Sequence, residues 1–355
     1  MITISLCMIV KNEESVIGRC LDSIADAVDE IIIVDTGSVD RTKEIAAAYT
    51  KKIYDFKWID DFSAARNFGY EKAGMDYQMW LDADDVITVQ EKEKLLALKA
   101  ELPADIDMVT MQYHVHFDEF GHPSMSSMRE RLTRTQNQYR WIEPVHECIP
   151  LQGKLYHADI AIEHRKESSE KASWRNIHIY EAMEKGGHSF SPRQLYYFAR
   201  ECKDHQLYEK AINYYEAFLN TGQGWVEDNI GACRGLAECY RYMGNEEKDL
   251  QTLLRSFAFD SPRAEVVCSI AYYYKDKLDY RIAADWFHLA LGLNKPESFC
   301  FTSPDYYDYI PHIELSVCLF HLGNLAQAIY HNEQAAVYKP ESKAVAFNKE
   351  FYNRC

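Results

Sequence analysis

The run Met79–Asp85, with the sequence MWLDADD, constrains the fold and the site more than any other stretch of the chain. Apolar residues on both faces are typical of a buried parallel strand, and ligand sites in open α/β sheets gather where such strands end. If the strand continues, Asp82 and Asp84 project to the same side and their oxygen atoms can hold a divalent cation. The alternative is that Asp84 and Asp85 only start a turn, and that Thr88 caps the next helix.

Composition favours a folded protein with two domains. The chain has 355 residues, of which 47% are hydrophobic and 26% charged, and this length accommodates two cores. The net charge of −16 disfavours nucleic acid or an anionic membrane as partner, because both bind basic surfaces. No apolar run approaches the roughly 18 residues that a membrane span needs. Ten cysteines without a C-x-x-C pair indicate reduced thiols, so we expect a cytoplasmic protein.

Strands and helices alternate along the first part of the chain. Buried strands are predicted at 3–10 and 30–35, helices at 15–24 and 40–46, and a further helix starts with Ser63 as its N-cap. This alternation predicts a parallel sheet with right-handed crossovers. The strand ends would bring a set of polar residues to one edge of the sheet: Lys11, Asn12, Glu13, Asp35, Asp82 and Asp84. The first turn lacks glycine, which excludes a dinucleotide-binding fingerprint and a P-loop there.

Four ordered segments resemble the GT-A domain of family 2 glycosyltransferases: CMIVKNEESVIGRCLDSI, EIIIVDTGSVDRT, DDFSAARNFG and WLDADD. The resemblance implies a nucleotide-sugar donor, with UDP favoured, and a divalent cation, Mn²⁺ or Mg²⁺, as cofactor. It implies the donor-binding residues Lys11, Asn12, Glu13, Asp35, Ser38, Arg66, Asp82 and Ala83. Asp35 would contact the nucleobase, Asp82 the ribose or the metal, and Asp84 would ligate the metal under the diphosphate.

Longer alternating strands are predicted at 108–117, 124–134 and 138–149, and they would form the acceptor side of this domain. The segment WIEPVHE resembles a further block of the family, in which an acid acts as general base of inverting transfer. We assign that role to Glu147, with Glu143 as its substitute.

Two histidines in this region have alternative interpretations. His146 and Glu147 could instead form a buried pair of hydrogen-bonded residues. His164 ends the last predicted strand and matches a position that ligates metal in several GT-A families, although a histidine there can equally be structural. His146 is a second candidate ligand of the metal.

The remainder of the chain is predicted to be helical and repetitive. Small residues recur at corresponding places, namely Ala199, Ala211, Ala237, Ala271, Ala283, Ser316 and Ala328. Their recurrence resembles the tetratricopeptide repeat, whose period is about 34 residues. An aromatic insertion at 295–311 breaks the period, and long loops of this kind are more often functional than structural. Such arrays usually bind peptides or a second copy of the chain.

These observations predict an α/β GT-A domain at 1–165, a connecting helix and linker at 166–192, and tetratricopeptide-like repeats at 193–355. This architecture resembles bacterial glycosyltransferases that modify bacteriocin peptides of the sublancin type. We therefore expect a metal-dependent, inverting enzyme that transfers a sugar to a peptide or protein at Ser, Thr or Cys. The repeats would bind the acceptor or form a homodimer. The alternatives are a glycan or lipid-linked acceptor, and a non-catalytic repeat scaffold.

Overall fold

The computed structural model describes residues 1–166, 173–296 and 299–354 of the chain, which forms two compact units. The first unit comprises residues 1–183 together with 298–302. The second comprises residues 184–297 and 303–355. The predicted connecting helix is α5 (Arg175–Lys185), and the first part of the segment predicted for it, through residue 172, lies outside the described residues.

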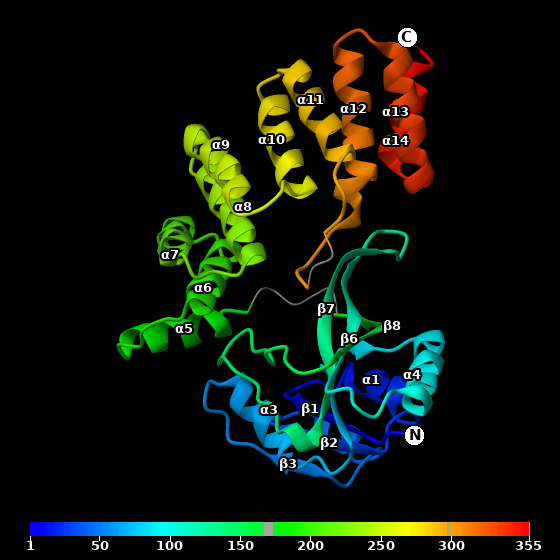
Figure 1. The fold of residues 1–355 in the computed structure, drawn as a ribbon, viewed down its shortest axis with the longest axis vertical. Coiled ribbons are helices and arrows are strands. Elements are labelled where there is room, and N and C mark those ends of the chain that lie inside the picture. Colours follow the sequence, from blue (N-terminus) through cyan, green and yellow to red (C-terminus); the bar gives the residue numbers. More distant parts are fainter. Residues whose placement is uncertain (167–172, 297–298, 355) are drawn as a thin grey trace. The chain divides into compact units, whose positions relative to one another are not determined.

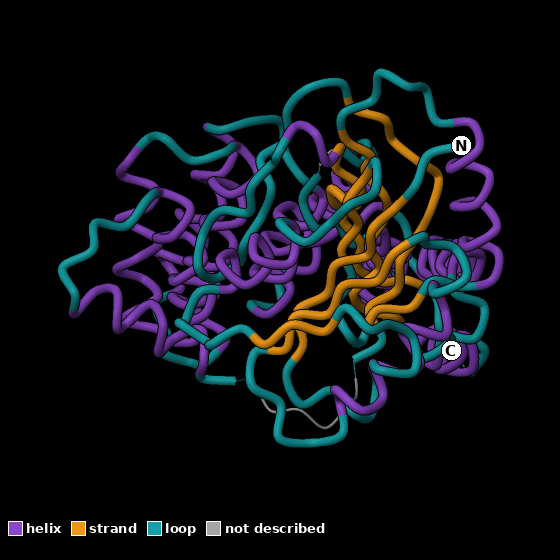
Figure 2. The backbone as a smooth tube through the Cα atoms, turned by 90° about the horizontal axis from the view of Figure 1, so that it is seen from below, coloured by secondary structure: helices purple, strands orange, loops and turns teal. Residues whose placement is uncertain are grey.

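The described strands of the first unit form one eight-stranded sheet in the order β3-β2-β1-β4-β7-β6-β8-β5. Figure 2 shows these strands gathered into one twisted layer. Strands β1, β2, β3 and β4 pair in parallel, whereas β7 runs antiparallel to β4 and to β6. Their bounds are β1 (Ile4–Val10), β2 (Glu30–Asp35), β3 (Ile53–Asp55), β4 (Tyr77–Trp80), β5 (Asp85–Val86), β6 (Met108–Phe117), β7 (Pro123–Arg134) and β8 (Leu155–His164). The predicted parallel sheet with an antiparallel extension, the GT-A fold, is therefore confirmed.

Helices connect the parallel strands as the alternation predicted: α1 (Ile17–Ile24), α2 (Thr42–Ala46), α3 (Phe62–Tyr70) and α4 (Val89–Glu101). Thr88 caps α4 through its hydroxyl, which accepts a hydrogen bond from the Glu91 amide at 3.3 Å. The predicted cap of α3, Ser63, is wrong. Asp61 caps this helix instead, because its carboxylate accepts from the Ala64 amide at 2.9 Å and thereby satisfies a free N–H of the first turn.

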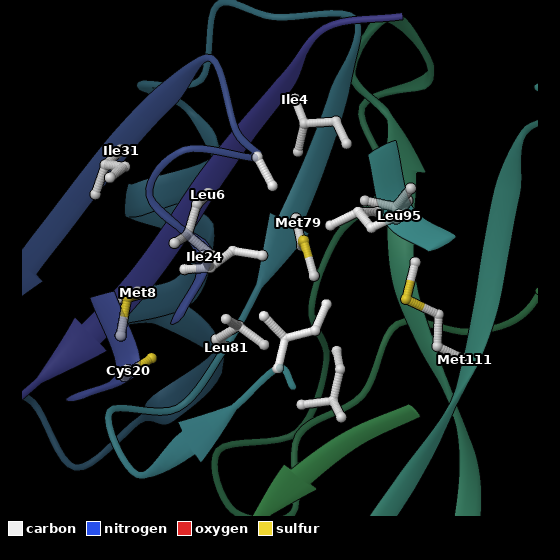
Figure 3. Close-up of a cluster of buried hydrophobic side chains, with 14 of the residues drawn as sticks. Ile4, Leu6, Met8, Cys20, Ile24, Ile31, Met79, Leu81, Leu95 and Met111 are labelled. Atoms are coloured by element: carbon white, nitrogen blue, oxygen red, sulfur yellow. The ribbon is translucent and has the colours of Figure 1, made fainter. Parts of the chain in front are cut away.

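Apolar side chains cover both faces of the parallel strands, which explains why their sequences are apolar throughout. On one face, residues of β1, β4, α1 and α4 pack together, as Figure 3 shows for Ile4, Leu6, Met8, Cys20, Ile24, Met79 and Leu95. On the other face, Cys7, Ile32 and Val34 pack with Trp80 and Trp141. Each fully buried aliphatic side chain contributes about 1.5–3 kcal/mol to stability, so the two layers fix the strand ends that carry the polar residues.

The strand predicted at 138–149 is wrong. After β7 the chain forms a 3₁₀ turn, η1 (Thr135–Asn137), and then an irregular segment with one isolated bridge between Ile142 and Cys148. Glu143 and His146 have positive φ angles of 72° and 55°, and Pro144 between them has no N–H to donate. A regular strand cannot accommodate this backbone, so the segment forms a loop that carries Glu147.

The second unit consists of helix pairs stacked in sequence order (Figure 1). Its helices after α5 are α6 (Pro192–Asp204), α7 (Tyr208–Thr221), α8 (Val226–Tyr242), α9 (Glu246–Arg255), α10 (Ala264–Asp276), α11 (Tyr280–Leu291), α12 (Tyr309–His321), α13 (Leu325–Tyr338) and α14 (Lys343–Tyr352), with 3₁₀ turns η2 (Ser256–Ala258) and η3 (Pro304–Tyr307). The recurring small residues are fully buried where the helices of a pair cross. At one crossing the Ser316 hydroxyl donates to the Ala328 carbonyl at 2.8 Å. The predicted tetratricopeptide-like repeats are confirmed.

Part of the aromatic insertion lies in the first unit. The amide of Thr302 donates to the Ser126 carbonyl at 2.9 Å, and the Ser126 amide donates to the Thr302 carbonyl at 3.1 Å, so this segment pairs with β7. The ring of Phe299 lies 5.7 Å from that of His157 on β8. The insertion is therefore an ordered part of the sheet edge at these residues. No helix in the described residues is long and apolar enough to cross a membrane.

Candidate active site

Strand β4 ends at Trp80, a turn follows at Ala83 and Asp84, and Asp85 begins the short strand β5. The Asp85 amide donates to the Asp82 carbonyl at 3.1 Å, and the Asp82 amide donates to the Asp85 carboxylate at 3.0 Å. The strand does not continue through Asp84, because these two hydrogen bonds close the backbone on itself, and the alternative of a turn with Thr88 capping the next helix describes this segment. As a consequence, the side chains of Asp82 and Asp84 have different partners.

Arg66 of α3 joins Asp82 to Glu147. Its Nη2 lies 2.7 Å from Oδ1 of Asp82, and its Nε lies 2.7 Å from Oε1 of Glu147. The guanidinium is only 7% exposed and stacks over the rings of Trp80 and Trp141, at 5.0 and 4.8 Å from their centroids. Burial favours the neutral form of Asp82, but the Arg66 charge outweighs it and lowers the pKa of this carboxyl group. Two acids from different segments are thus held on one cation.

Asp84, Asp85 and His164 form a second cluster, in which their possible ligand atoms lie within 4.8 Å of one another. Nδ1 of His164 lies 3.3 Å from Asp84 and 3.2 Å from Asp85. Burial disfavours the charged imidazole, but hydrogen bonds to the two carboxylates outweigh this effect and raise the pKa of His164 to about 10. The terminal residue of β8 is thereby held beside the end of β4.

The surroundings of the two carboxylates distinguish their chemistry. Asp85 is fully buried, and it accepts from the Tyr113 hydroxyl at 2.9 Å and from Nη1 of Arg131 at 3.2 Å. Asp84 and His164 retain side-chain exposures of 22% and 24%. A carboxylate and an imidazole that reach the surface fit a divalent cation, whereas Asp85 has protein partners for both oxygens and fits the role of orienting His164. His146 is not part of this cluster.

The turns after β1 and β2 are tied to each other. The amide of Asn12 donates to the Ser38 hydroxyl at 3.0 Å, and the Asn12 side chain accepts from the Val39 amide at 2.8 Å. Asp35 is 2% exposed, and its carboxylate accepts from the amides of Gly37 and Ser38 at 3.1 and 3.0 Å. These bonds explain why an acid at the end of a buried strand is tolerated.

The other predicted donor residues flank these turns. Lys11 is exposed, and Glu13 is half-buried, with its amide donating to the Thr42 hydroxyl at 2.7 Å. Ala83 is buried between the acids of the β4 turn. The carboxyl edge of the parallel strands thus combines two rigid turns with the two acidic clusters.

Comparison with known proteins identifies this domain. Residues 5–163 match the model of the family described as Glycosyl transferase family 2. Residues 5–163 are a family 2 glycosyltransferase domain. The match spans the sheet from β1 nearly to the end of β8, and it includes every site residue described above except His164.

Curated relatives share parts of the chain. A TPR repeat-containing protein of Synechococcus elongatus is 35% identical over 149 residues, which are 42% of this chain and 36% of that protein. The SPbeta prophage-derived glycosyltransferase SunS of Bacillus subtilis is 29% identical over 233 residues, which are 61% of this chain and 53% of SunS. This chain therefore matches only about a third to a half of the length of these relatives.

Two solved structures show a loose likeness to parts of the chain. Glucosyl-3-phosphoglycerate synthase from Mycobacterium tuberculosis, in complex with Mn²⁺ and UDP-glucose, is 15% identical, with 54% of this chain and 81% of that chain covered and a TM-score of 0.37. A thermophilic TPR protein of Thermus thermophilus is 16% identical, with coverages of 50% and 89% and a TM-score of 0.36.

Sequence reasoning missed two residues of the glycosyltransferase domain that organise its acidic turn. Arg131 on β7 is fully buried, lies 3.7 Å over the Trp80 ring and ion-pairs with Asp85. Tyr113 on β6 donates to the same carboxylate. Alternation along β7 gives no signal for this burial, because Arg129 and Thr133, two residues away on either side, are polar. A buried arginine requires an acidic partner, and Asp85 was the nearest unexplained acid in the motif.

Proposed function

We propose that the glycosyltransferase domain transfers a sugar from a nucleotide-diphosphate sugar, with UDP as the favoured nucleotide, to a side chain of a polypeptide. The observation that carries this proposal is the pair Asp84 and His164 at the carboxyl end of β4, in a domain of this family. A diphosphate beside three aspartates would meet like charge, and a bound Mn²⁺ or Mg²⁺ reverses the local sign. Asp84 and His164 would hold that cation, and Asp85 would keep the imidazole oriented.

The tied turns supply the nucleotide pocket in this proposal. Asp35 would contact the nucleobase, and the backbone near Lys11 and Asn12 would line the same pocket. Support comes from the hydrogen bonds between Asn12 and Ser38, which fix the two turns before any ligand arrives. Preorganised polar groups cost less ordering entropy on binding. Asp82 would contact the ribose from the turn that Arg66 steadies.

Glu147 would act as the general base. It would take the proton of a Ser or Thr hydroxyl or a Cys thiol, while that oxygen or sulfur bonds to the anomeric carbon and the bond from this carbon to the diphosphate oxygen breaks. Attack opposite the leaving group inverts the anomeric centre. Support comes from the Arg66 bridge, which fixes Glu147 relative to Asp82 on the donor side. Glu143, in the same loop, is the substitute candidate.

A polypeptide acceptor is favoured over a glycan or a lipid carrier. The resemblance to bacteriocin-peptide glycosyltransferases and the stacked helix pairs support this choice, since repeat arrays present extended surfaces that bind peptides. The acids of both clusters are present, which disfavours a decayed, non-catalytic domain. A cytoplasmic location and a homodimer formed through the repeats remain predictions of the sequence.

The decisive experiment compares Asp84→Asn with wild type in calorimetric titrations of UDP-sugars, with Mn²⁺ and with EDTA. The heat of donor binding should require the cation in wild type and should largely disappear in the variant. Asp159→Asn is a matched control, because it removes the same charge from a side chain of the same domain that is 98% exposed. Undiminished donor binding in EDTA would contradict the metal role.

A further inference from the structure

Two arginines of the second unit form no ion pair within 4 Å among the residues that the structure describes. Arg200 lies on α6 and Arg234 on α8, which are the first helices of consecutive pairs. Both guanidinium groups lie close to aromatic rings. Arg200 Cζ lies 5.7 and 5.3 Å from the ring centroids of Tyr196 and Tyr197, and Arg234 Cζ lies 5.9 Å from that of Tyr306. Both guanidiniums therefore retain most of their hydrogen-bonding capacity.

The two arginines surround one tyrosine. Tyr196 reaches from α6 to α8, because a Cβ added to Gly231 would lie 2.5 Å from its hydroxyl oxygen. Burial raises the pKa of Tyr196, and the charges of Arg200 and Arg234 both oppose this rise. Both charges thus act on the same ring, and we call the surface formed by Tyr197, Arg200, Arg234 and Tyr306 the arginine–tyrosine patch.

The patch contrasts with the rest of the second unit. Several other basic side chains there are ion-paired, such as Arg241 with Asp249 at 2.8 Å and Arg255 with Glu216 at 3.1 Å. Asp228, on the same helix as Arg234, is partly buried, and burial raises its pKa to about 6 in spite of the charges of Arg193 and Arg200. In a chain of net charge −16, Arg200 and Arg234 thus stand without a direct ion pair among the described residues.

We propose that the arginine–tyrosine patch binds carboxylate side chains of an acidic segment in the polypeptide acceptor. A guanidinium presents a planar fork that matches a carboxylate, and such charge-assisted pairs are stronger than neutral hydrogen bonds. The rings of Tyr197 and Tyr306 lie 5.3 and 5.9 Å from the Cζ atoms of Arg200 and Arg234, which is within the range of cation–π attraction. The inference rests on the proposed function only for the identity of the acidic segment as part of the acceptor.

The test measures fluorescence anisotropy of a short labelled peptide that alternates Glu with Ser, added to the full-length protein without nucleotide. A matched peptide that alternates Gln with Ser removes the charge. Arg200→Gln and Arg234→Gln should each weaken binding of the Glu peptide by roughly ten-fold or more, and Arg200→Lys should weaken it less. Arg281→Gln is the control, since its guanidinium is 69% exposed and already pairs with Asp285.

Equal affinity for the Glu and Gln peptides would overturn the inference, as would an equal loss of affinity in Arg281→Gln and in the patch variants. Absence of binding at millimolar peptide would also overturn it. Circular dichroism of each variant confirms that its helices remain folded. Donor titration of the same proteins separates this inference from the proposed function. Arginine-dependent peptide binding without donor binding would support the peptide-binding role of the patch and contradict the proposed transferase activity. Donor binding without arginine-dependent peptide binding would support the transferase and contradict the role of the patch.

Discussion

Replacing Arg66 by Met should destabilise the first unit by about 3–5 kcal/mol. The substitution keeps most of the side-chain volume but leaves two carboxylates without their shared cation. Glu147 is 13% exposed, so the loss of its partner should have the full cost of breaking a buried ion pair, about 3–5 kcal/mol. Asp82 is 35% exposed, and solvent screening reduces its share to about 1 kcal/mol or less.

The substitution also changes the response to acid. With Arg66 present, the pKa of Asp82 lies below its value in the unfolded chain, so this group stabilises the fold at neutral pH and the stabilisation is lost as the pH falls through the folded pKa. Without Arg66, the desolvation of Asp82 is no longer opposed. Its pKa should rise, and the variant should gain stability relative to wild type as the pH is lowered toward 4.

Hydrogen exchange with mass spectrometry is the suitable assay, because it reports opening free energies of α3 and β1 separately from the second unit. Arg66→Met combined with Glu147→Gln should recover about 2 kcal/mol, since it removes the stranded charge. Arg140→Met is the control, because this arginine is 60% exposed and pairs with an exposed glutamate. A loss below about 1 kcal/mol in Arg66→Met, or no recovery in the double variant, would refute the reasoning.

Three further predictions concern other groups. Glu147→Gln should bind donor normally and turn over roughly 10²- to 10⁴-fold more slowly in a transfer assay, with Glu143→Gln milder; near-full turnover would move the base elsewhere. Asp85→Asn should destabilise the first unit by about 3 kcal/mol in hydrogen exchange, because it leaves Arg131 buried without a counter-charge; unchanged exchange would reject this role. Burial and two neighbouring histidines lower the pKa of His331 to about 4. Between about pH 4 and about pH 6.5 the unfolded chain binds a proton that the folded chain does not. The free energy of unfolding should therefore fall by up to about 3 kcal/mol as the pH drops from about 6.5 to 4. In urea unfolding, His331→Asn should show a weaker dependence on pH.

The sequence predicted the regular parts of the fold because their patterns report burial directly. Apolar residues on both faces located β1, β2 and β4, and recurring small residues located the helix crossings of the second unit. The segment 138–149 failed because its apolar residues suggested alternation, whereas its backbone requires positive φ at Glu143 and His146. Glutamate and histidine do not by themselves indicate a positive φ angle, so this conformation could not be predicted from the sequence.

The sequence predicted which acids and histidines belong to the site, but not which of them contact one another. Asp84 and His164 are far apart in sequence and meet only because β5 pairs with β8, where Asp85 lies opposite His164. Arg66 was predicted as a donor contact, whereas the structure shows it bound to Asp82 and Glu147. Which arginine pairs with which acid depends on the tertiary structure. The sequence alone therefore cannot show which carboxylate is ion-paired and which remains available to a ligand.

Among the described residues, arginines are ion-paired at the site of the first unit and are not ion-paired in the patch of the second unit. This difference allows the binding of the two proposed ligands to be distinguished experimentally. In the first unit Arg66 and Arg131 are buried and ion-paired with Asp82, Glu147 and Asp85, whereas Asp84 stays partly exposed and could bind a cation. In the second unit Arg200 and Arg234 keep their forks available. Contacts at the partly exposed patch are screened by salt within roughly 10 Å at 0.1 M, whereas a cation ligated directly by Asp84 is screened less. Raising the ionic strength should therefore weaken acidic-peptide binding more steeply than metal-dependent donor binding.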